Sequence, residues 1–140
     1  MTTKASARWT QNEQFVGMAS SGHAIVADAG DHKTANSPME LVLIGLCSCT
    51  ASDIVNILRK KREPFTSLEV RAEAERASTV PMVYTKIKLV YRVGGKVSRK
   101  AVEDAVGLSE EKYCSVSGML QKTAKITYEI EYADEVVEVG

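Results

Sequence analysis

The feature that most constrains the fold is the segment 37–62, SPMELVLIGLCSCTASDIVNILRKKR, in which a single glycine is the only helix breaker after Pro38. Ser37 suits a helix N-cap, Pro38 suits the first helical position, and Glu40 completes a capping box. Lys and Arg residues end the segment, and Pro64 prevents its continuation. The sequence therefore predicts a helix of about 25 residues, about 37 Å long at about 1.5 Å per residue.

The two halves of this predicted helix differ in character. Residues 39–46 are almost entirely apolar, so we expect the first turns to be buried on all sides. From Asp53 onward apolar and polar residues alternate with helical spacing, which predicts an amphipathic second half. The apolar run is short for a membrane span, and charges flank it and enter the pattern. We interpret the segment as a core helix.

Length and charge limit the class of protein. The 140 residues favour one domain, 1–140, and 18 basic residues balance 18 acidic ones. A formal net charge of zero gives no general attraction to nucleic acid or to an anionic membrane, so neither is expected as a partner. The N-terminal MTTKASARW lacks an apolar signal core, which predicts a cytoplasmic protein.

The remaining pattern predicts six strands and two short helices around the long one. Strands are expected at 4–10, 14–19, 23–28, 67–76, 82–92 and 123–132, a helix of about ten residues capped by Ser98, a polar joint at 109–113 and a helical piece at 115–122. Residues 134–140 form either a last strand or a frayed end. This order predicts an α+β fold with a long central helix packed against antiparallel sheets. One sheet cannot cover the apolar helix on every side, so a homodimer is expected.

The three cysteines are the candidate chemical groups. Cys47 and Cys49 are about 200° apart around the helix, with Cys47 on an apolar stripe and Cys49 on a polar face that includes Asp53. Cys47 is interpreted as a small buried side chain. Cys114 precedes the helical piece 115–122, whose N–H groups are expected to stabilise a thiolate and lower its pKa. Cys49 and Cys114 are a plausible pair for disulfide exchange or peroxide reduction.

No metal site or cofactor is predicted. A Cys-x-Cys sequence within a helix points its two thiolates in different directions, so the pair cannot chelate one ion. His23 and His32 lie in a strand and a loop without ligand spacing.

The motif SPMELVLIGLCSCTASDIVNIL, followed by LSEEKYCSVSGML, resembles the OsmC/organic hydroperoxide resistance superfamily and is most similar to its YhfA-like branch. The resemblance runs from ARW near the start, through SGHAIVAD, to the final strand. It implies the OsmC-like α+β fold, an intertwined homodimer and two active sites at the subunit interface. By this resemblance Cys49 is the peroxidatic thiolate that attacks an organic or fatty hydroperoxide. Cys114 then resolves the sulfenic acid as a disulfide, which an external thiol or lipoyl protein reduces.

The chain departs from the family pattern around the reactive cysteine. Active members carry Glu ten residues before it, where this chain has Met39, and Glu40 matches the second acidic residue. The family arginine that lowers the thiolate pKa has only Arg8 and Lys33 as positional candidates. Two alternatives to a peroxidase therefore remain. One is a dimeric small-ligand-binding or redox-sensing protein of the same fold, and the other is a structural fold with inert thiols.

Overall fold

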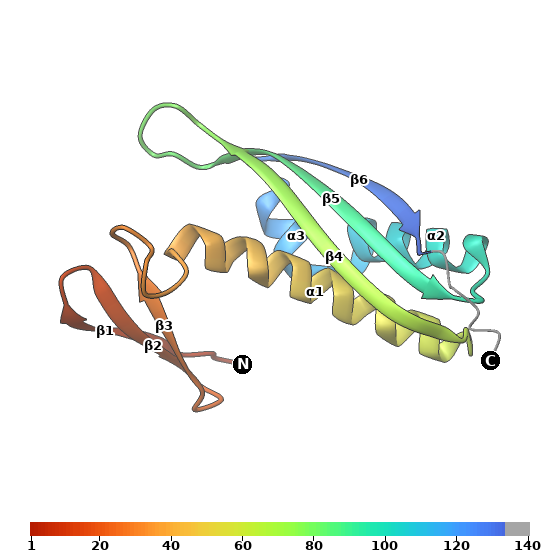
Figure 1. Ribbon diagram of the computed structural model, residues 1–140, viewed down its shortest axis with the longest axis horizontal. Helices are drawn as coiled ribbons and strands as arrows, with labels where there is room; N and C mark the ends of the chain where they lie inside the picture. The colour runs from red at the N-terminus through yellow and green to blue at the C-terminus, as the bar shows by residue number, and fades with distance from the viewer. Residues whose placement is uncertain (134–140) are drawn as a thin grey trace. The chain divides into compact units, whose positions relative to one another are not determined.

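The computed structural model describes residues 1–133 as two compact units, the first spanning Met1–Ile44 and the second beginning at Gly45 (Figure 1). Helix α1 (Pro38–Lys60) begins in the first unit and continues into the second. The residues 134–140, for which a last strand or a frayed end was expected, lie outside the described residues.

The first unit contains a three-stranded antiparallel sheet in the order β1-β2-β3. β1 (Ala5–Gln11) pairs with β2 (Gln14–Ala19), and β2 pairs with β3 (Ala24–Asp28), which confirms the three strands expected here and their antiparallel pairing. The loop after β3 is held by the Asp28 carboxylate, which accepts hydrogen bonds from the Gly30 N–H and the Thr34 hydroxyl, both at 2.8 Å.

The second unit contains a mixed sheet in the order β4-β5-β6. β4 (Phe65–Arg76) and β5 (Tyr84–Gly95) form a long antiparallel pair, but β6 (Lys125–Tyr132) runs parallel to β5. The expected all-antiparallel pairing is therefore wrong at β6. Helical segments connect β5 to β6, and a crossover of this kind returns the chain in the direction of the first strand.

That crossover consists of α2 (Arg99–Leu108), the π-helical turn η1 (Ser109–Tyr113) and α3 (Ser115–Leu120). The Ser98 hydroxyl caps α2 by accepting a hydrogen bond from the Ala101 N–H at 3.2 Å, as predicted. The segment expected to be a polar joint is the π-helical turn. The crossover helices lie on the same side of the sheet as α1 (Figure 1). The shared core is largely aliphatic and is built from Leu46, Ile54, Leu58, Ile87, Leu89, Tyr91, Val93, Val102 and Val106.

The start of α1 has the predicted capping box. The Glu40 N–H donates to the Ser37 hydroxyl at 3.1 Å, and the Ser37 N–H donates to the Glu40 carboxylate at 2.9 Å. Two orphan donors of the helix terminus are thereby satisfied.

Burial along α1 is narrower than expected. The buried stripe consists of Leu46, Thr50, Ile54 and Leu58. Val42 and Ile44 are 38% and 47% exposed, so the prediction of all-round burial in the first turns is wrong for the single chain. An 18-residue window of α1 has a mean hydropathy of 1.9 and is 22% buried, so the helix is long and apolar enough to span a bilayer by length and composition alone. Core helices of soluble proteins meet the same criterion.

Candidate functional site

The second unit brings Cys49 and Cys114 together, although 65 positions separate them in the sequence. Cys49 is half-buried on α1, and Cys114 is 5% exposed at the N-cap of α3. Cys49 lies near enough to Cys114 to raise its pKa, and neither cysteine is in a disulfide. The two thiols of the predicted pair are thus neighbours, one half-buried and the other buried.

The environment of Cys114 favours the neutral thiol. Burial raises the pKa of Cys114 to about 12, the neighbouring Cys49 and the charge of Asp53 raise it as well, and the Ser117 N–H opposes them by donating to Sγ at 3.4 Å. The start of α3 does lower this pKa through the Ser117 N–H, as expected, but burial outweighs it, so the expectation of a lowered pKa for Cys114 is wrong. One N–H contact with a six-residue helix does not compensate for removing the thiolate from water.

Asp53 belongs to this site. It lies one helical turn after Cys49 on the same face of α1, and its carboxylate accepts a hydrogen bond from the Ser109 hydroxyl at 2.8 Å. The charge of Asp53 raises the pKa of Cys114, so this carboxylate acts as a negative charge beside the thiol pair.

Five further polar residues surround the thiol pair, and the sequence did not identify them. Thr50 contacts the Tyr91 hydroxyl at 2.8 Å and the Ser109 hydroxyl at 2.7 Å. The Tyr91 hydroxyl donates to the Glu110 carboxylate at 2.5 Å, and the Ser117 hydroxyl donates to the other oxygen of that carboxylate at 3.3 Å. Burial and the hydrogen bond to Glu110 both raise the pKa of Tyr91, so this phenol keeps its proton.

The sequence held one usable signal for this cluster. Thr50 lies four residues after Leu46 and four before Ile54, so a hydroxyl interrupts a stripe that is otherwise aliphatic. A buried hydroxyl needs a partner, which predicts polar groups on whatever packs against the stripe. Ser109 and Glu110 gave no such signal, because a π-helical turn cannot be distinguished from a polar joint by composition.

Cys47 lies apart from this pair. It is half-buried, whereas a buried position was expected, and the stripe that packs into the core passes through Thr50 instead of through Cys47. Burial raises the pKa of Cys47, so this thiol is also held neutral.

The other two predicted site residues belong to the first unit. Arg8 is exposed on β1 and lies opposite Val16 in the sheet. The Glu40 carboxylate is engaged in the capping box, and the Ser37 N–H and hydroxyl lower its pKa. The Lys33 N–H donates to the Asp31 carboxylate in the loop before α1. These contacts give Glu40 a structural role in the first unit.

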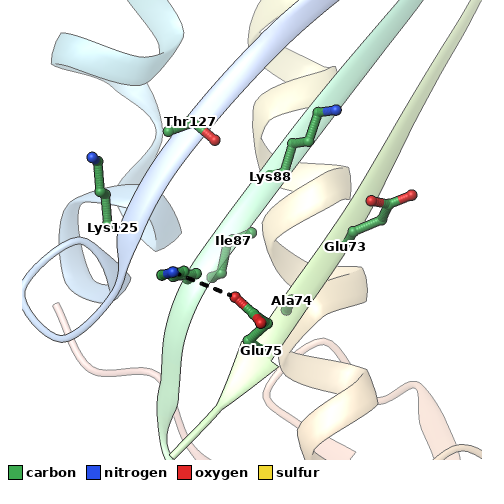
Figure 2. Close-up of a pocket in the computed structure, with 8 residues that line it drawn as sticks. Glu73, Ala74, Glu75, Ile87, Lys88, Lys125 and Thr127 are labelled. Atoms are coloured by element: carbon green, nitrogen blue, oxygen red, sulfur yellow. Dashed lines mark ion pairs between the residues drawn. The ribbon is translucent and has the colours of Figure 1, made fainter.

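A cavity of about 370 Å³ adjoins the thiol site through Asp53. Its lining combines apolar and cationic side chains, from Asp53, Asn56, Ile57, Lys60, Lys61, Leu108 and Tyr113. A second hollow of about 390 Å³ lies on the charged outer face of the β4-β5-β6 sheet and contains the exposed Lys86–Glu75 ion pair at 3.9 Å (Figure 2). Its lining holds no cysteine or histidine, so the first cavity is the one placed next to reactive groups.

Residues 1–133 contain no cluster of side chains that could bind a metal ion. Among those residues, no group of three or more histidine, cysteine or acidic side chains is arranged to hold an ion.

Comparison with known proteins identifies the family. The family model for OsmC-like proteins matches residues 30–129. Protein YhfA of Escherichia coli K12 is 40% identical over 129 residues, which cover 91% of this chain and 96% of that protein. A solved OsmC-like protein from Mycoplasma pneumoniae has a TM-score of 0.82 at 14% identity, covering 95% of this chain and 98% of its own. An organic hydroperoxide resistance protein OsmC from Legionella pneumophila has a TM-score of 0.71 at 17% identity, covering 94% and 97%. The family model and the 40% identical relative show that this chain belongs to the OsmC-like family.

Proposed function

We propose that this protein is a thiol-dependent peroxidase that reduces organic or fatty hydroperoxides through Cys49 and Cys114. The proximity of these two thiols carries the proposal, because a peroxidatic cysteine needs a nearby partner thiol to form a disulfide. A solved structure with this fold bears the name of an organic hydroperoxide resistance protein, which supports the choice of substrate class.

The burial of the two thiols supports different roles for them in this proposal. Cys49 is half-buried and can meet a substrate, whereas Cys114 is 5% exposed and its raised pKa keeps it protonated. In the first step the Cys49 thiolate attacks the terminal oxygen of ROOH and the O–O bond breaks. The alkoxide takes a proton and leaves as ROH, and Cys49 becomes a sulfenic acid.

In the second step the Cys114 sulfur attacks the Cys49 sulfenic acid. The S–S bond forms, the S–O bond breaks, and the thiol proton leaves with the hydroxide as water. An external dithiol or a lipoyl protein then reduces the disulfide by exchange, which returns both thiols. The cytoplasm, where thiols remain reduced, is the compartment that suits this cycle.

The cavity beside Asp53 supplies space for the organic part of the substrate. Ile57, Leu108 and Tyr113 give it apolar wall area, and Leu108 and Tyr113 are 38% and 50% exposed. Apolar walls with a few polar groups are typical of small-molecule sites.

The test is consumption of cumene hydroperoxide with dithiothreitol or a lipoyl reductant. Cys49→Ser is expected to abolish turnover, and Cys47→Ser serves as the matched control because Cys47 lies on the same helix outside the pair. Cys114→Ser is expected to stop at a sulfenic acid that dimedone traps on Cys49. Unchanged turnover in Cys49→Ser would contradict the proposal.

One observation favours a second candidate, a redox-sensing protein of the same fold. The groups that act on Cys114 include the negative charge of Asp53, and none of the main contributions to its pKa from residues 1–133 comes from a cation. A sensor would form the Cys49–Cys114 disulfide with one equivalent of peroxide but would show no sustained turnover. A mass map of the three cysteines before and after peroxide, combined with the turnover assay, separates the two functions.

A further inference from the structure

A row of oxygen atoms runs from Asp53 to Glu110 beside the thiol pair. Asp53, Ser109, Thr50, Tyr91 and Glu110 follow one another through four contacts of 2.8, 2.7, 2.8 and 2.5 Å. Ser109, Thr50 and Tyr91 are fully buried, and the two carboxyl ends are half-buried. We call these five residues the hydroxyl chain.

The hydroxyl chain needs one more proton than its hydroxyls supply. Each contact requires one hydrogen between its two oxygens, so four contacts require four hydrogens. Serine, threonine and tyrosine hydroxyls each carry one, and an ionised carboxylate carries none. Three hydroxyls therefore satisfy three contacts, and the fourth would press two oxygen lone pairs together in a buried site.

We infer that Asp53 and Glu110 share one proton through the three hydroxyls. When Asp53 carries the proton, it donates to Ser109, and the remaining hydroxyls donate in turn toward Glu110. When Glu110 carries it, every donor reverses and Ser109 donates to Asp53. The Ser117 hydroxyl does not enter this count, because it brings its own hydrogen to the second oxygen of Glu110.

The position of this proton sets the charge beside the thiols. With the proton at Glu110, Asp53 is an anion next to Cys114 and opposes formation of the Cys114 thiolate. With the proton at Asp53, that opposition is removed. Thr50, Tyr91, Ser109 and Glu110 are thus positioning residues that act on the thiol pair through Asp53. This role deepens the proposed peroxidase function, but the shared proton itself exists in the resting, reduced protein.

The test is Thr50→Val, which removes the central hydroxyl and keeps the side-chain shape. In that variant Ser109 donates to Asp53 and Tyr91 donates to Glu110, so both carboxyls ionise and the extra proton is released. The infrared spectrum of the reduced protein at mildly alkaline pH, where exposed carboxyls are ionised, should show the carbonyl stretch of one neutral carboxylic acid. Carbon-13 labelling of aspartate and glutamate assigns this band to the two end groups.

The band is expected in the wild type and in Ser117→Ala, the matched control that leaves all four contacts intact. It is expected to disappear in Thr50→Val and, as a second variant, in Ser109→Ala. A wild type without the band, or a band that persists in both variants, would overturn the inference. Because no peroxide is used, these outcomes are independent of hydroperoxide turnover.

A second measurement connects the hydroxyl chain to the thiols. At the mildly alkaline pH of the infrared experiment, alkylation of Cys114 is expected to be slower in Thr50→Val than in Ser117→Ala, because Asp53 is then permanently charged. Equal alkylation rates would show that the chain does not act on the thiol pair.

Discussion

At the scale of single residues, the reactivity of Cys114 depends on the charge of one neighbouring side chain, Asp53. Desolvation and the nearby Cys49 and Asp53 raise the pKa of Cys114 to about 12, and the thiolate is the form that attacks. Alkylation of Cys114 and closure of its disulfide are therefore expected to accelerate as pH rises toward that value. Asp53→Asn removes the negative charge that Asp53 carries when the shared proton is at Glu110, so the pKa of Cys114 falls and its alkylation at mildly alkaline pH accelerates, roughly tenfold for one pKa unit. Alkylation followed by mass spectrometry measures this, with Asp104→Asn on α2 as control, and equal rates would show that Asp53 has no effect.

Residue chemistry was partly predictable for a physical reason. Cys49 and Asp53 share a helix face by the 3.6-residue period, and Cys114 was identified by its place before a helix. The sign of the pKa change at Cys114 was not predictable, because it depends on burial by segments distant in sequence. The partners of Thr50 were hidden for the same reason, since Tyr91 lies 41 positions away and Ser109 lies 59 away.

At the scale of elements, the glycine that ends β5 marks a turn that tolerates no side chain, whereas a glycine in α2 does not. Gly95 ends β5 with φ +110, and a Cβ there would lie 2.6 Å from the Pro64 carbonyl oxygen. Gly95→Ala is expected to lower the free energy of unfolding by at least about 1–2 kcal/mol, the cost of a left-handed conformation for a non-glycine residue. Gly107→Ala near the end of α2 meets no atom within 4 Å and is expected to raise it by up to about 1 kcal/mol. Urea unfolding measures both, and a neutral Gly95→Ala would contradict the crowding at this turn.

Elements were easier to predict than their pairing. The capping box, the Ser98 cap and the alternating strands are local patterns, and the structure has all of them. The parallel direction of β6 and the π-helical turn are consequences of how α2 and α3 cross the sheet. Neither feature can be predicted from the spacing of apolar residues in the sequence.

At the scale of the whole molecule, the exposed face of α1 requires an explanation. Only Leu46, Thr50, Ile54 and Leu58 form the buried stripe, while Val42 and Ile44 are 38% and 47% exposed. Apolar side chains exposed on a helix of such high mean hydropathy indicate an interaction site. A second copy of this chain is the proposed occupant, because a two-fold axis presents the same apolar face from both subunits.

The homodimer makes a prediction that separates it from a membrane-spanning helix. Without detergent, light scattering is expected to give twice the mass of the chain, since paired α1 helices cover each other's apolar side chains. Ile44→Lys places a charge on that face and is expected to shift the protein toward the monomer by at least tenfold in dissociation constant, the factor that about 1.4 kcal/mol gives. Val80→Lys is the control, because Val80 is 90% exposed between β4 and β5. A monomer at all concentrations would exclude the dimer, and recovery only with lipid or detergent would favour a membrane role for α1.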